Sequence, residues 1–235
     1  MKTTTLHYAS RDGKSTIHAL VWEPDASAGE TPKPRGIVQI VHGMSEHVER
    51  YEPFAKFLVS GGFVVCANDH VGHGASVGDA SDLGHMPAHG GAEVLVEDAH
   101  ALRETLAARY PDAPYVVFGH SMGSFIARKY ITEHGAGLAV AILCGTGQQA
   151  AALSMAGNVL ANALARLHGE RHKSELLHSM ADGAYSKAVK NARTDFDWLS
   201  RDPAVVDAYI SDEKCGQMFT VGGYATLTSL TGEVV

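Results

Sequence analysis

A short glycine-rich turn between an expected strand and an expected helix constrains this chain more than any other feature. Residues 114–118 are an apolar run typical of a buried strand, and residues 122–134 have the character of a helix. Ser121 lies between them in the pattern G-x-S-x-G, flanked by Gly119 and Gly123. In this context the pattern predicts a nucleophile elbow, a sharp turn that presents a serine hydroxyl at the carboxyl end of a sheet. The two glycines allow the strand and the helix to approach closely.

The bare pattern is weak evidence by itself, because it occurs a second time at residues 74–78, around Ser76. Ser76 follows a long loop rich in glycine and histidine and precedes more loop, whereas Ser121 directly follows a strand and opens a helix. The alternative for Ser121 is a serine that only caps the helix. A cap explains neither the two glycines nor His120, so we predict that Ser121 is a nucleophile and that Ser76 is not.

A second turn is expected to supply one of the backbone amides that a nucleophilic serine needs nearby. Acyl transfer requires two backbone N–H groups aimed at the developing oxyanion. One comes from the residue after the nucleophile, here Met122, and the other from the loop after an earlier strand. Residues 37–41 are a strand of this kind, and His42 and Gly43 follow at once. We therefore predict an oxyanion hole formed by Met44 and Met122, with the alternative that His42 and Gly43 form only a turn.

The order of the other elements predicts an α/β fold. Two strands around an Asp-Gly turn read as an N-terminal antiparallel hairpin, and the remaining strands alternate with amphipathic helices. This alternation predicts a mostly parallel sheet with helices on both faces and the hairpin at one edge. The expected strands are 3–8, 15–22, 36–41, 63–67, 114–118 and 138–143, the last of them buried, and the expected helices include 51–58, 93–109 and 220–230.

The composition changes after Gly145. Residues 148–167 are rich in alanine, with Ala156, Leu160, Ala163 and Leu167 at helical spacing, and no run typical of a strand follows before residue 210. We interpret residues 146–215 as a helical lid inserted into a core formed by residues 1–145. Residues 216–235 then begin the return to the core.

The bulk composition excludes several classes of protein. The net charge of −7 provides no basic excess for binding nucleic acid. The three cysteines are odd in number and far apart, which favours buried thiols in a reducing compartment, and we expect a cytoplasmic location. We find neither a signal peptide nor a transmembrane span, and we expect no cofactor.

The loop at residues 69–76 is rich in titratable side chains. A metal site is one interpretation, but no second cluster with ligand spacing supports it. We favour hydrogen bonds that fix the shape of the loop, and we predict no metal.

Several segments resemble the monoacylglycerol lipase and lysophospholipase group of α/β-hydrolases, the serine aminopeptidase-like class. The resemblance covers nearly the whole chain and implies a carboxylic-ester hydrolase that acts on monoacylglycerols, lysophospholipids or similar single-chain esters. The lid would shelter the acyl chain. We leave contact of the lid with a membrane surface open, because the sequence has no basic amphipathic helix to support it. The segments that carry the resemblance are residues 42–47, 68–74, 119–123, 193–203 and 209–220.

The resemblance places the triad acid and histidine after two later strands, which these 235 residues do not include. We therefore expect a fragment without triad acid or histidine, with a bare apolar edge at residues 138–143, poor solubility and negligible esterase activity. A peptidase, thioesterase or acyltransferase on the same scaffold is an alternative, as is a non-catalytic protein that binds an acyl ligand. The side chains excluded as triad members by their position are His134, His168, His172, His178, Asp182, Asp195, Asp197, Asp202, Asp207 and Asp212.

Overall fold

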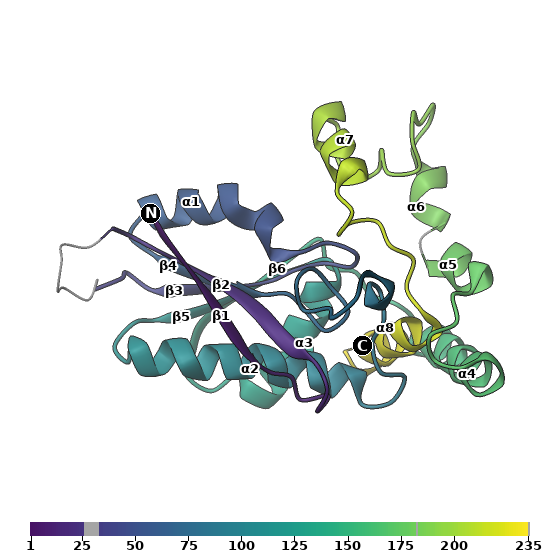
Figure 1. Cartoon of the computed structure of the whole chain (residues 1–235), viewed down its shortest axis with the longest axis horizontal. Coiled ribbons are helices and arrows are strands. Elements are labelled where there is room, and N and C mark those ends of the chain that lie inside the picture. The colour runs from purple at the N-terminus through teal and green to yellow at the C-terminus, as the bar shows by residue number, and fades with distance from the viewer. Residues whose placement is uncertain (26–32, 182, 235) are drawn as a thin grey trace.

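The computed structural model describes residues 1–25, 33–181 and 183–234, and Figure 1 shows the whole chain. Most of the polar connection at residues 24–34 therefore lies outside the described residues, as does Asp182. The centre of the molecule is a six-stranded sheet with the strand order β1-β2-β4-β3-β5-β6. The strands are β1 (Lys2–Ala9), β2 (Thr16–Glu23), β3 (Ile37–Val41), β4 (Val64–Asn68), β5 (Tyr115–His120) and β6 (Leu138–Cys144).

The predicted N-terminal hairpin forms one edge of this sheet. β1 pairs antiparallel with β2, and β2 pairs antiparallel with β4. The Asp12 carboxylate accepts the backbone N–H groups of Lys14 and Ser15, and Gly13 has a φ of 73°. An aspartate followed by a glycine in the left-handed region is what a tight turn requires, so this prediction is confirmed.

The parallel strands β4, β3, β5 and β6 form the rest of the sheet. α1 (Glu52–Ser60) covers one face, and α2 (Gly91–Arg109) and α3 (Met122–His134) cover the other (Figure 1). The apolar face expected for the 93–109 helix is buried in α2, where Leu95, Ala99, Leu102 and Leu106 are at most 1% exposed. Helices on both faces explain why every residue of β3 and β4 is buried, including Gln39 and Asn68, and the predicted α/β class is confirmed.

β6 forms as a strand but is not buried, which corrects one prediction. It pairs only with β5 and lies at the edge of the sheet, so Val140 and Ile142 are 48% and 42% exposed. A run of apolar residues can predict a strand, but its burial depends on neighbours that the run itself does not specify. Within the part of the chain that the structure describes, no element covers this edge.

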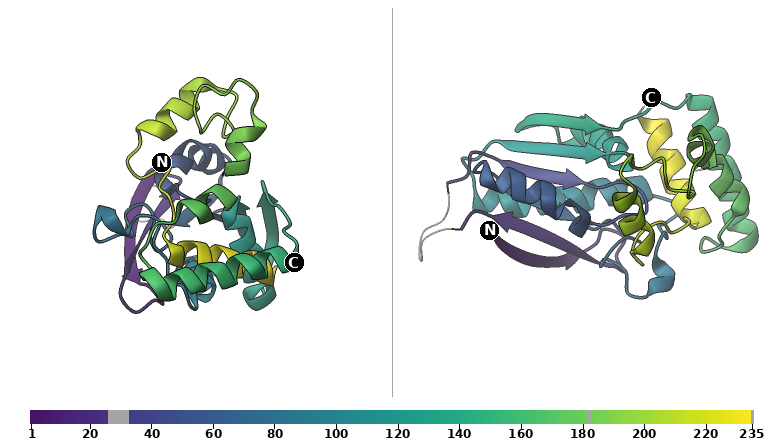
Figure 2. Two further views of the ribbon diagram at one scale, coloured as in Figure 1. Left: turned by 90° about the vertical axis from the view of Figure 1, so that its right-hand side faces the viewer. Right: turned by 90° about the horizontal axis from the view of Figure 1, so that it is seen from above.

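The segment after β6 is helical, and α8 returns towards the core. Figure 2 shows that the carboxyl ends of β3, β5 and β6 point towards α4 and α8, and Figure 1 shows α7 on the same side of the sheet as α1. No described helix is both long and apolar enough to cross a membrane. The helices are α4 (Ala151–His168), α5 (Glu175–Ala181), α6 (Gly183–Ala188), α7 (Pro203–Ser211) and α8 (Val221–Glu233).

α4 packs against α8 through small residues. Ser154, Gly157 and Ala161 are buried, and a Cβ atom added at Gly157 would lie 3.0 Å from the Thr228 Cγ2 atom. Of the apolar stripe seen in the sequence, Leu160 packs partly against the core, whereas Ala156 and Ala163 are exposed and Leu167 at its end is 74% exposed. The close contact between the helices selects for small side chains rather than for hydrophobic ones.

Candidate active site

Ser121 lies at the turn between β5 and α3 in a strained backbone conformation, with φ 52° and ψ −119°. Both flanking glycines are required by close contacts. A Cβ atom at Gly119 would lie 2.4 Å from the Gly123 carbonyl oxygen, and one at Gly123 would lie 2.0 Å from the Val41 carbonyl oxygen. The predicted strand–turn–helix geometry is thus present, and strain of this kind is typical of functional sites.

The loop of residues 42–47, which we call the 42–47 loop, passes directly beside Ser121. A Cβ atom at Gly43 would lie 3.2 Å from the Ser121 Cβ atom. Among the described residues, neither the Met44 nor the Met122 N–H group donates a hydrogen bond. Both amides are therefore free to serve as the predicted oxyanion hole, which stays a prediction.

Glu46 anchors the 42–47 loop from within. One carboxylate oxygen accepts the Gly43 N–H at 2.6 Å and the Tyr51 hydroxyl at 2.7 Å, and it contacts His120 Nδ1 at 3.2 Å. The other oxygen forms an ion pair with Arg50. Burial acts to raise the pKa of Glu46, but the hydrogen bonds from His120 and Tyr51 and the positive charge of Arg50 outweigh it and lower the pKa to about 2.

His42 is buried with both ring nitrogens engaged. Its Nδ1 lies 2.8 Å from the Gly43 carbonyl oxygen, and its Nε2 accepts the His70 N–H at 3.1 Å. Nε2 therefore carries no proton, so the ring is neutral and Nδ1 donates to Gly43. Burial, reinforced by His73, lowers the pKa of His42 to about 3. His42 is thus a support for the loop and has no free nitrogen to activate Ser121.

The titratable residues of the 69–76 loop are used in hydrogen bonds. The Asp69 carboxylate accepts the N–H groups of Val48 and Ala75 and contacts His18 Nδ1 at 3.0 Å. Ser76 is buried, and its hydroxyl donates to the Asp69 carbonyl while accepting the His18 N–H. The hydrogen-bonding interpretation of this loop agrees with the geometry, and Ser76 is not available as a nucleophile.

The described histidines and acids after Ser121 make no hydrogen bond or ion pair with it. His134 lies at the far end of α3, where its Nε2 is 2.7 Å from Glu97. His178 hydrogen-bonds to the Tyr224 hydroxyl. Within residues 1–25, 33–181 and 183–234, the Ser121 hydroxyl makes no hydrogen bond to a side chain, so the structure brings no triad histidine or acid to it.

A junction that the sequence did not predict holds the 42–47 loop to the end of the helical segment. Ser45 has a φ of 52°, and its carbonyl oxygen accepts both the Gly216 N–H and the Tyr209 hydroxyl at 2.9 Å. The Ser45 hydroxyl donates to the Gln217 carbonyl oxygen. We call these four residues the Ser45 junction. The sequence pointed to these residues only because segments 42–47 and 209–220 carry the family resemblance.

The parallel sheet, the serine at the strand–helix turn and the adjacent amide donors define an α/β-hydrolase. The family model described as serine aminopeptidase, S33 (Hydrolase_4) matches residues 32–235. The chain therefore belongs to the serine aminopeptidase S33 family of hydrolases.

Individual relatives agree with this assignment. A monoacylglycerol lipase of Mycolicibacterium smegmatis is 31% identical over 82% of this chain and 58% of its own length. The human monoglyceride lipase is 32% identical over 52% of this chain and 36% of its own length. The chain thus spans less than two thirds of the length of each of these relatives.

Solved structures show the same fold. A thermostable carboxyl esterase from Bacillus coagulans, in complex with glycerol, has a TM-score of 0.87 and 33% identity, covering 98% of this chain and 73% of its own. A lipase in an open form has a TM-score of 0.83 and 27% identity, covering 99% of this chain and 74% of its own.

Proposed function

We propose that the protein is a serine hydrolase of carboxylic esters that forms an acyl-enzyme on Ser121. The observation that carries this assignment is the strained Ser121 backbone beside Gly43, with the free N–H groups of Met44 and Met122 next to it. The hydroxyl would attack the ester carbonyl, and the two amides would stabilise the oxyanion that develops.

The substrate would be a monoacylglycerol or a lysophospholipid, as the similarity to monoacylglycerol lipases suggests. Residues 146–215 would act as the lid over the acyl chain and could meet a membrane surface. An exposed apolar face of α4 supports a lipid substrate, and it is formed by Ala152, Met155, Ala156, Val159, Leu160 and Ala163. The cysteines Cys66, Cys144 and Cys215 are all free, which supports a reducing, cytoplasmic location, although Cys144 is exposed rather than buried as expected.

No described residue is assigned as the triad histidine or acid. A serine hydroxyl is a weak nucleophile until a base takes its proton. Residues 1–235 alone are therefore expected to hydrolyse esters at a negligible rate, while free imidazole in solution can act as the missing base.

The test is labelling with a fluorophosphonate, which reacts with activated serines. We expect imidazole to accelerate labelling of the purified protein, with no acceleration in Ser121→Ala and full acceleration in the matched control Ser76→Ala. Labelling that is unchanged in Ser121→Ala would reject Ser121 as the nucleophile. Rapid ester turnover without imidazole, lost in Ser121→Ala, would instead show that a base is already present.

Two other functions are compatible with the same scaffold. A peptidase, thioesterase or acyltransferase would use Ser121 on a different substrate, and the family description includes an aminopeptidase. A panel of monoacylglycerols, lysophospholipids, thioesters and aminoacyl amides distinguishes these activities. A non-catalytic acyl-binding protein would bind fatty acid without imidazole-dependent labelling of Ser121.

A further inference from the structure

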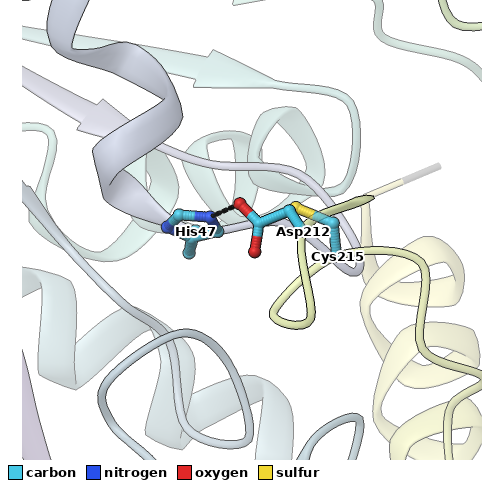
Figure 3. Close-up of side chains that lie close together, drawn as sticks. All are labelled: His47, Asp212 and Cys215. Atoms are coloured by element: carbon cyan, nitrogen blue, oxygen red, sulfur yellow. Dashed lines mark hydrogen bonds and ion pairs between the residues drawn. The ribbon is translucent and has the colours of Figure 1, made fainter. Parts of the chain in front are cut away.

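Three side chains from two distant segments meet beside the 42–47 loop (Figure 3). His47 is the last residue of that loop, and Asp212 and Cys215 belong to the turn that follows α7. One nitrogen, oxygen or sulfur atom from each lies within 4.8 Å of the others. The hydrolytic chemistry at Ser121 uses none of these residues.

The carboxylate of Asp212 is held in place for His47. One oxygen accepts the Lys214 N–H at 2.8 Å, and the other lies 2.7 Å from His47 Nε2. The Cys215 N–H donates to the Asp212 carbonyl oxygen at 2.9 Å, which closes the turn and brings the thiol beside the carboxylate. Two of the three donors are thus placed by one short backbone turn.

The set of donors fits zinc. Imidazole nitrogen, thiolate sulfur and carboxylate oxygen are the three ligand types of Zn²⁺, and a tetrahedral site separates them by about 3.3–3.6 Å. The three atoms now lie within 4.8 Å of one another, so a bound ion would only have to adjust these separations. His47 and Cys215 are 4% and 8% exposed, so two of the ligands are already withdrawn from water.

A separate observation concerns the other nitrogen of His47. Its Nδ1 is buried without a hydrogen-bond partner among the described residues, and the nearest carboxylate, that of Glu49, lies 3.5 Å away. When Nε2 binds a metal, Nδ1 carries the proton and commonly donates it to a carboxylate. Glu49, which is also paired with Lys214, stands where that carboxylate is needed.

Cys215 must lose its proton to become a ligand. A bound cation would favour that loss.

We propose that His47 Nε2, Asp212 and Cys215 form a zinc-binding site, with water as the fourth ligand and Glu49 hydrogen-bonded to His47 Nδ1. The site joins the 42–47 loop to the segment after α7, at the same place as the Ser45 junction. Zinc bound there would fix the loop that carries Met44 without touching Ser121.

Cobalt is the direct probe, because a tetrahedral Co²⁺ site with a thiolate ligand absorbs in the near ultraviolet through sulfur-to-metal charge transfer. We expect one Co²⁺ per chain with this band, displaced by Zn²⁺. Cys215→Ser should lose the band, and the matched control Cys144→Ser should keep it. Retention of the band in Cys215→Ser, or its absence in folded wild type at saturating Co²⁺, would overturn the site.

A second variant tests the arrangement around the metal. Glu49→Gln should weaken zinc affinity roughly 10–100-fold, as expected for loss of a carboxylate behind a histidine ligand. Circular dichroism in the presence of a chelator verifies that each variant is folded. His134→Gln serves as a control for the second group of potential ligands, Glu97, Glu133 and His134. An affinity that falls in His134→Gln but not in Glu49→Gln or Asp212→Asn would place the zinc elsewhere.

Discussion

The Ser45 hydroxyl donates a 2.6 Å hydrogen bond to the carbonyl oxygen of Gln217, a residue 172 positions later in the chain. The two residues belong to the loop beside Ser121 and to the segment that leads into α8. The position of the Met44 amide therefore depends on a part of the chain that follows helices α4 to α7.

Tyr209→Phe tests the strength of this junction. The Tyr209 hydroxyl is buried, donates to the Ser45 carbonyl oxygen and accepts the Gly216 N–H at 3.1 Å. Its removal leaves buried polar groups with fewer partners, so we expect a loss of about 1–3 kcal/mol in the free energy of unfolding. Urea denaturation measures it. Tyr185→Phe, at a side chain that is 51% exposed, should change stability by less than about 0.5 kcal/mol. Equal effects of the two changes would contradict the importance of the junction.

Gly123→Ala tests the close approach at the elbow. The added methyl group would lie 2.0 Å from the Val41 carbonyl oxygen, which is backbone and cannot move aside cheaply. We expect a loss of more than about 4 kcal/mol, or no folded protein at all. Gly78→Ala is the control from the second G-x-S-x-G pattern, because nothing lies within 4 Å of its added Cβ atom. The melting temperatures and soluble yields of the two variants are compared. A stable Gly123→Ala protein would show that the strand and the helix can separate enough to admit the methyl group.

His42→Asn tests the neutral imidazole behind the 42–47 loop. The folded pKa of His42 is about 3 against an ordinary value of 6.5, so its contribution to stability is full above about pH 6.5 and is lost as the pH falls towards 3. Asparagine does not titrate, and its amide can still donate to the Gly43 carbonyl oxygen. We expect the stability advantage of wild type over His42→Asn to shrink by up to about 1.4 kcal/mol per pH unit. Denaturation series from pH 7 to pH 4 measure this difference, which should be constant if the pKa of His42 is the same in the folded and unfolded states.

Asp98→Asn tests a group whose contribution to stability changes with pH in the opposite direction to that of His42. Asp98 is 1% exposed and accepts hydrogen bonds from Ser10 and Arg11, so it joins the N-terminal hairpin to α2. Burial raises its pKa from 3.8 to about 6, although these hydrogen bonds act in the other direction. Its favourable contribution is therefore present below about pH 4 and is lost as the pH rises through 6.

Relative to Asp98→Asn, wild type should become less stable by up to about 3 kcal/mol between pH 4 and pH 7. Chemical denaturation of both proteins over this range supplies the measurement. A difference that grows in favour of wild type as the pH rises would show that the hydrogen bonds outweigh burial.

The elbow could be predicted from the sequence because its signal is local. The apolar strand, the two glycines and the helix are contiguous around Ser121, and each meets a steric requirement of its neighbours. The Asp-Gly hairpin turn and the apolar face of α2 were predictable for the same reason.

Features that depend on distant partners were not predictable. The apolar stripe ending at Leu167 indicated a helix but not which face packs, because the residues of α4 that are buried are the small ones, Ser154, Gly157 and Ala161. The Ser45 junction joins residues more than 160 positions apart, and no pattern in either segment predicts contact with the other. The sequence indicated Glu46 only as a member of the 42–47 loop. Its buried charge network depends on the folded positions of Arg50 and His120, which the sequence does not show.

The strained backbone of Ser121 also affects how the sequence of this protein can evolve. At φ 52° and ψ −119° a glycine would relax a strain of about 1–3 kcal/mol that any residue with a side chain must bear. Selection for stability alone would therefore favour glycine at position 121. The serine marks a trade-off between stability and function, and a lineage that lost the need for the reaction would be expected to lose this side chain early.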